Sequence, residues 1–158
     1  MIAFDTLSWA KIFRLYEKHG LRVKFEESEV LLTHSLHKEL VYFYPDRREF
    51  FEKFPVLPII GDVYRELVNL GFDPADASLL EYAIERDIII ITEDRDMLSY
   101  GYIKRLKVMQ LADFIVYTAI SGDSKINDAM KAIRILRRME NITKRKYRRL
   151  TKILKQIS

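Results

Sequence analysis

The chain has 158 residues and no cysteine, which excludes disulfides, thiolate metal sites and a cysteine nucleophile. Its length suits one domain, and 49% hydrophobic with 32% charged residues is a globular composition. No apolar run is long enough to span a membrane. The first five residues include an acid, Asp5, and no base, which is unlike a signal peptide. We therefore predict a cytoplasmic protein without membrane contact.

The net charge of +4 is unevenly divided along the chain. Residues 123–158 contain 12 lysines and arginines against three acids and carry +9, whereas residues 1–122 contain 15 bases against 20 acids and carry −5. A basic end indicates either a polyanionic partner or simply a solvated helix face, and both interpretations stay open at this point.

Hydrophobic spacing and helix stop signals predict alternating strands and helices. Met1 to Phe4 is a short apolar run, typical of a buried strand, and it ends at Asp5. The isoleucines at 88–91 predict a parallel strand covered on both faces. Further strands are expected at 30–32 and 107–109. Helices are expected around 9–19, 34–44, 50–54, 58–70, 74–84, 113–120, 126–136 and 144–157, with Thr33 and Asp73 as N-caps and Pro74 at a first helical position.

This order of elements predicts the α/β class, with a mainly parallel sheet between two layers of helices. After Gly122 the two basic helices are expected to form a hairpin that packs on the body through its apolar residues. We therefore expect a domain over residues 1–122 and a C-terminal basic helical extension over 123–158 that packs on it.

Acidic residues follow the predicted strands, at the edge where parallel sheets bind ligands. Asp5 follows the first strand, and Asp94 and Asp96 follow the isoleucine strand. Asp76 lies in the first turn of the helix before that strand, and Glu39 lies two turns into the helix after the second strand. Carboxylates gathered at one edge repel one another unless cations lie between them, and sites made of carboxylates favour Mg²⁺ or Mn²⁺. Taken singly, Asp76 is also typical of a helix N-terminus and Glu39 of a surface charge.

The order and spacing of these motifs resemble the PIN-domain ribonuclease family, including VapC-type toxins and their stand-alone relatives. The motifs are FDT at 4–6, HKEL at 37–40, PADASLLEYA at 74–83 and ITEDRD at 91–96, and the resemblance covers residues 1–120. It implies a PIN-like three-layer α/β/α fold and a metal-dependent ribonuclease.

The resemblance also implies a set of site residues. The aspartates of the family match Asp5, Asp76 and Asp94, its helical glutamate matches Glu39, a frequent fifth acid matches Asp96, and its strand-end hydroxyl matches Thr92. The acids are then the catalytic groups and the ligands of Mg²⁺ or Mn²⁺, with Asp96 as a second-metal ligand, and Thr92 supports the site.

The implied activity is an endoribonuclease that cleaves phosphodiester bonds of RNA with a metal-activated water. Such a chain would be the toxin of a toxin–antitoxin pair, with an antitoxin protein and a second copy of itself as partners. The basic extension exceeds a minimal toxin of this kind, which weakens the toxin role more than the nuclease role. The alternative is a catalytically silent PIN-fold module that binds nucleic acid or protein.

Other chemistries have less support. The chain contains neither GxGxxG nor GxxxxGK[ST], so no dinucleotide site or P-loop is indicated. His34 and His37 are spaced for a zinc pair, but no third soft ligand is near them in sequence. The bases expected to contact RNA are Arg95, Lys144, Arg145, Arg148 and Arg149, although the hairpin they mostly occupy is equally expected to serve only for packing.

Overall fold

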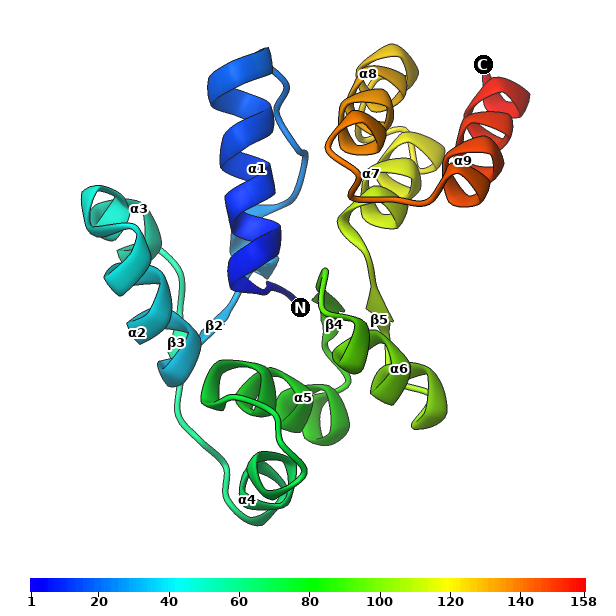
Figure 1. Cartoon of the computed structure of the whole chain (residues 1–158). Helices are drawn as coiled ribbons and strands as arrows, with labels where there is room; N and C mark the ends of the chain where they lie inside the picture. The colour runs from blue at the N-terminus through cyan, green and yellow to red at the C-terminus, as the bar shows by residue number, and fades with distance from the viewer. The chain divides into compact units, whose positions relative to one another are not determined.

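Figure 1 shows the computed structural model of the chain, which describes residues 1–158. The strands are β1 (Ile2–Phe4), β2 (Leu32–Thr33), β3 (Val56–Leu57), β4 (Ile89–Ile91) and β5 (Val108–Met109). The helices are α1 (Thr6–His19), α2 (His34–Phe43), α3 (Arg48–Glu52), α4 (Asp62–Asn69), α5 (Pro74–Arg86), α6 (Arg95–Ile103), α7 (Leu111–Ile120), α8 (Ile126–Arg138) and α9 (Lys144–Ile157), with 3₁₀ turns at Glu27–Glu29 and Pro45–Arg47.

The chain packs as two compact units. The first unit comprises residues 1–9 and 26–109 and contains every strand, whereas the second comprises residues 10–25 and 110–158 and contains helices and loops only. The charge pattern suggested a division after residue 122 instead, and that division stays a prediction. The two helices expected within 123–158 are present as α8 and α9.

The sheet of the first unit is parallel throughout. Three strands pair in the order β1–β4–β5, with Ile2 opposite Ile89 and Ile90 opposite Val108. β2 and β3 form a second parallel pair, and a single parallel bridge joins Ile2 to Val30 just before β2. The predicted α/β class with a mainly parallel sheet is therefore confirmed. Because all strands run the same way, their carboxyl ends deliver the residues that follow them to one edge.

Local capping signals in the sequence are confirmed in the structure. The hydroxyl of Thr33 accepts a hydrogen bond from the backbone N–H of Leu36 at the start of α2. The carboxylate of Asp73 accepts one from the N–H of Asp76, and Pro74 occupies the first turn of α5. These residues satisfy N–H groups that have no partner within the helix, so a short motif is enough to fix each helix start.

The predicted helix over 58–70 begins later than expected, at Asp62. The buried carboxylate of Glu81 on α5 accepts hydrogen bonds from the backbone N–H groups of Ile60 (2.6 Å), Gly61 (3.1 Å) and Tyr64 (2.7 Å). Gly61 has a φ of 155°, a conformation that favours glycine. The segment before α4 is thus an extended loop held by a distant acid, which helical spacing cannot reveal.

Two elements were not predicted from the sequence, β3 and α6. β3 has only two residues and pairs only with β2, so its pattern is too short to read. α6 begins with Asp94 as N-cap, whose carboxylate accepts from the N–H of Met97. Its Gly101 faces β5, where a Cβ would lie 2.6 Å from a methyl carbon of Val108. A glycine that lowers helix propensity is here required by close packing.

In the second unit, α7, α8 and α9 pack against one another through buried apolar side chains such as Ile133, Leu150 and Leu154. The N-cap of α9 is Thr143, whose hydroxyl accepts from the N–H of Lys146. Nowhere in the chain is a helix of the length and apolarity that crossing a membrane requires.

Candidate functional site

Asp5 is the first acid of the site and the most deeply buried. It follows β1 directly, and only 3% of its surface is exposed. One carboxylate oxygen accepts the backbone N–H of Ser8 at 2.8 Å, and the other accepts the hydroxyl of Thr92 at 2.5 Å and the N–H of Glu93 at 3.3 Å. Burial raises the pKa of Asp5, although these hydrogen bonds act in the opposite direction. The orientation of its carboxylate is therefore fixed by the first turn of α1 and by the two residues that follow β4.

Thr92 connects Asp5 to Asp94. Its buried hydroxyl donates to Asp5 and accepts the backbone N–H of Asp94 at 3.0 Å. The Asp94 carboxylate then caps α6 by accepting the N–H of Met97 at 2.9 Å. The residue that the family resemblance implies as a support therefore contacts one acid through its side chain and orients the backbone of the other.

Glu39 lies half-buried on α2, and one of its carboxylate oxygens accepts the hydroxyl of Thr6 at 2.6 Å. Thr6 is the residue after Asp5, so the hydrogen bond holds the glutamate beside the start of α1. Sequence reasoning did not assign a role to Thr6 or to Ser8, although both are hydroxyl residues next to the first acid. Ser8 donates its hydroxyl to the carbonyl of Ile91 at 3.0 Å, which fastens α1 to the end of β4.

Asp76 is the acid whose charge state depends most on its neighbours. It is half-buried in the first turn of α5, and its pKa is raised from 3.8 to about 8. Burial is the largest cause, followed by the negative charges of Asp73, Asp5, Asp94 and Glu39 in that order. A charge acts on a carboxyl in this way only from nearby, so four acids from four separate segments of the sequence share one neighbourhood.

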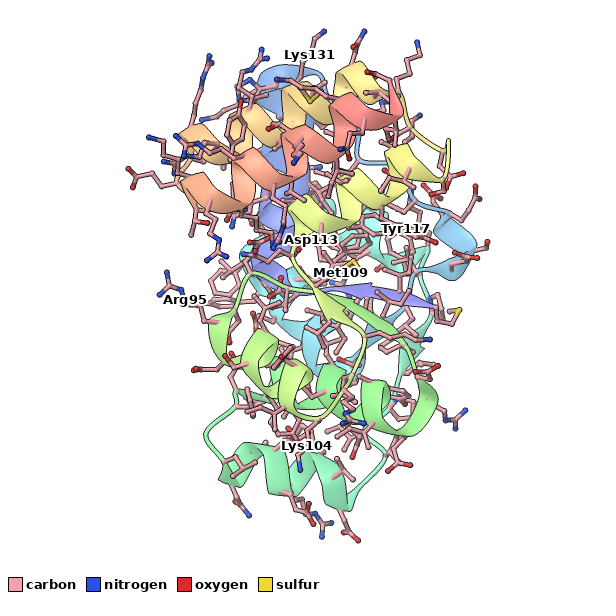
Figure 2. The ribbon with its side chains drawn as sticks, turned by 90° about the vertical axis from the view of Figure 1, so that its right-hand side faces the viewer. Arg95, Lys104, Met109, Asp113, Tyr117 and Lys131 are labelled. Carbon is pink, nitrogen blue, oxygen red and sulfur yellow. The ribbon has the colours of Figure 1, made fainter.

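Asp96 and Arg95 are placed differently. Both side chains are exposed in the first turn of α6, and Asp96 is absent from the charges that raise the pKa of Asp76. Figure 2 shows Arg95 extending outward from the ribbon. The structure thus brings together Asp5, Glu39, Asp76 and Asp94, of which Thr92 contacts Asp5 and Asp94, and it leaves Asp96 on the solvent side.

The donor chemistry of this cluster fits a hard divalent cation, because every side chain in it offers oxygen. Its geometry is less complete, since no group of three or more histidine, cysteine or acidic side chains is arranged to enclose a metal ion. The raised pKa of Asp76 is consistent with this incomplete geometry. Without a metal ion, a proton on Asp76 reduces the negative charge that a bound cation would otherwise neutralise.

Glu81 is the acid that sequence reasoning missed. It is fully buried, and its two oxygens accept the three backbone N–H groups before and within α4. The neighbouring Tyr82 donates its hydroxyl to the carbonyl of Pro58 at 2.5 Å. In the sequence, the only signal for this role is an acid among apolar neighbours in a helical stretch. Glu81 positions a loop and does not join the acidic cluster.

The predicted RNA-contacting bases of the second unit, Lys144, Arg145, Arg148 and Arg149, all lie exposed on α9. No family model matches the chain, and neither a curated protein nor a solved structure is significantly similar to it. The resemblance to PIN domains therefore depends on the sequence motifs alone.

Proposed function

We propose that the protein is a divalent-metal-dependent endoribonuclease with a PIN-like three-layer α/β/α architecture. The observation that supports this proposal most directly is that the charges of Asp5, Asp94 and Glu39 contribute, after burial and the charge of Asp73, to the raised pKa of Asp76. Acids held close together without bases between them repel one another and lower the stability of the fold. Such an arrangement is expected where the acids bind a cation.

The residues of the chain have distinct tasks in this proposal. Asp5, Glu39, Asp76 and Asp94 would hold Mg²⁺ or Mn²⁺, which, when bound, supplies a water activated for attack on a phosphodiester and neutralises negative charge on the phosphate. Thr92 and Thr6 fix the carboxylates of Asp5 and Glu39 by donating hydroxyl protons to them. The α6 N-terminus fixes Asp94. No such hydrogen bond holds the carboxylate of Asp76, which in this proposal would exchange its proton for the cation.

RNA cleavage with and without a chelator tests the proposal. Full-length protein with Mn²⁺ or Mg²⁺ should cleave a mixture of labelled RNAs at internal bonds, and EDTA should abolish the activity. The variants Asp5→Asn, Asp76→Asn, Asp94→Asn and Glu39→Gln should each lose at least about 100-fold, since even the partners of metal ligands are worth 10–100-fold.

The matched control is Asp62→Asn, which removes an acid whose side chain is 93% exposed in the same unit. It should cleave like the wild type. Undiminished cleavage by any two of the four site variants contradicts the site. A folded wild type that binds RNA and never cleaves it supports the catalytically silent module instead. The toxin role and an antitoxin partner extend this proposal and need the same activity first.

A further inference from the structure

α9 has one strongly basic side, which we call the α9 basic face. Its members are all exposed and lie on one side of the helix, and they are Lys144, Arg145, Arg148, Arg149, Lys152 and Lys155. The opposite side is buried, with Leu150 at 3% and Leu154 at 0% exposure. The helix is therefore docked by its apolar side and presents its cations outward.

The cations of this face have no acidic partner. No ion pair in the structure includes any of the six, and α9 itself contains no acid. The one base of the helix that is paired is Lys146, which donates to Asp113 at 2.5 Å and also to Gln110, with only 17% of its side chain exposed. Lys146 thus anchors α9 to the start of α7, where Figure 2 labels Asp113, and the other six do no comparable structural work.

This arrangement costs stability. Lys144 and Arg148, and likewise Arg148 and Lys152, are like charges four residues apart, each pair destabilising a helix by roughly 0.2–0.5 kcal/mol. The first turn of α9 contains bases and no acid, which is the unfavourable sign for a helix N-terminus. Packing explains neither feature, whereas a bound polyanion would offset both.

The surface also has a shape suited to anionic groups. Arg148, Thr151, Lys152, Lys155 and Gln156 line an open hollow of about 460 Å³. Arginine and lysine donors around such a hollow suit phosphate oxygens, which accept charge-assisted hydrogen bonds. From Lys144 to Lys155 the face extends over roughly 16 Å at 1.5 Å per residue, which is several times the spacing of successive phosphates in a strand.

Two polyanionic surfaces could match these charges, a membrane and a nucleic acid. Basic amphipathic helices bind anionic membranes by inserting their apolar side, but Leu150 and Leu154 are already buried against α7 and α8. A phosphodiester backbone needs no insertion. The one aromatic residue of α9, Tyr147, is half-buried and does not belong to the α9 basic face, so the face offers contacts to phosphates and none that read a sequence.

We propose that the α9 basic face binds the phosphodiester backbone of single-stranded RNA without sequence preference. The choice of RNA as the polyanion rests on the proposed function, whereas the binding itself does not require cleavage. The face holds substrate by neutralising phosphates and releasing counterions, which makes its contribution strongly dependent on salt.

The test measures RNA affinity against salt concentration in the full chain. Asp94→Asn serves as the background so that the labelled oligouridine probe stays intact, and fluorescence anisotropy gives the dissociation constant across a range of KCl concentrations. Replacing Arg148, Lys152 and Lys155 by glutamine, a good helix former, should reduce the slope of log K against log salt by about 0.7 per contact, or about 2 in all.

The matched control replaces three exposed bases of the first unit, Arg65, Arg86 and Lys104, by glutamine and removes the same charge. Its salt slope should stay within about 0.7 of the parent, the value of one contact. An unchanged slope in the α9 variant, equal losses in both variants, or binding to phosphatidylserine vesicles in preference to oligouridine overturns the proposal. Loss of the slope in a protein that never cleaves RNA supports the α9 basic face and contradicts only the nuclease.

Discussion

At the scale of single residues, the acidic cluster combines fixed and unfixed carboxylates. Asp5 receives three hydrogen bonds, and Asp94 and Glu39 receive one each from Met97 and Thr6. Asp76 is oriented by none of these, and it is the acid whose pKa rises to about 8. The proton that the cluster keeps near neutral pH is therefore held where no other group stabilises the charge.

This difference gives the metal-free protein a characteristic dependence on pH. The folded state keeps a proton on Asp76 up to about pH 8, whereas the unfolded chain releases it near 3.8. Because the folded state binds more protons between these values, the free energy of unfolding should fall as pH rises from about 4 to about 8. The raised pKa of Asp5 acts with the same sign.

Urea denaturation with EDTA, at pH 5.5 and pH 8.5, measures the effect. One pKa unit corresponds to about 1.4 kcal/mol, so the contribution of Asp76 should lower the wild-type stability by at least that amount between the two conditions. Asp76→Asn should lose most of this decline and be the more stable protein at the higher pH. Parallel declines in both proteins would mean that Asp76 is not perturbed by its neighbours.

At the scale of elements, Glu81 is an acid that holds the loop before α4 by accepting its backbone N–H groups. Its carboxylate satisfies the N–H groups of Ile60, Gly61 and Tyr64, which lie about 20 residues earlier in the chain. Glu81→Gln keeps the size but turns an acceptor into a donor that faces backbone N–H groups. Hydrogen bonds to a charged group are worth ≈ 1.5–3 kcal/mol, so we expect a loss of about 2–3 kcal/mol in unfolding free energy.

The matched control for this change is Glu85→Gln, which replaces an exposed acid on the same helix. It should stay within about 0.5 kcal/mol of the wild type, as surface substitutions do. Chemical denaturation of both variants gives the comparison. Equal stabilities would show that the loop before α4 does not depend on Glu81.

The difference between local signals and contacts to distant residues explains how far the sequence predicted the elements. Caps such as Thr33 and Asp73 act over three residues, and the four isoleucines at 88–91 form one apolar run, so local pattern was sufficient for these features. The start of α4 and the position of Gly101 depend on Glu81 and on Val108, partners that hydrophobic spacing does not reveal. The features that were missed are thus a two-residue strand and positions that need a distant partner, whereas the N-cap of α6, Asp94, was a local signal that the sequence did offer.

The candidate site was also predicted only in part from the sequence. Asp5 and Asp94 follow apolar strands directly, and Asp76 and Glu39 lie on helices next to strands, so topology alone predicts that they approach one edge. The hydrogen bonds of Thr6 and Ser8 join residues that are 33 and 83 positions apart in the chain, and Asp96 is exposed in the first turn of α6. Contacts between residues so far apart depend on tertiary packing, which a short motif does not encode.

At the scale of the whole molecule, like charges gather in two places and lower the stability of the folded state by repelling one another. The first unit gathers acids without a base among them, and α9 of the second unit gathers bases without an acid. Repulsion of this kind lowers the free energy of unfolding, and a ligand of opposite charge that binds only the folded state restores it. A divalent cation and a polyanion are then expected to stabilise the chain separately, each through its own cluster.

Thermal melting with Mn²⁺ tests the first of these expectations on the full chain. A ligand at a hundredfold excess over its dissociation constant stabilises the folded state by about 2.7 kcal/mol, which is roughly 5–10 °C in melting temperature at this chain length. The wild type should therefore melt higher in Mn²⁺ than in EDTA at pH 8, where Asp76 can exchange its proton for the cation. Asp76→Asn should gain much less, because it offers no charge there, while the exposed variant Asp62→Asn should respond like the wild type. If Mn²⁺ leaves the wild-type melting temperature unchanged, the four acids do not form a cation site, whatever their proximity.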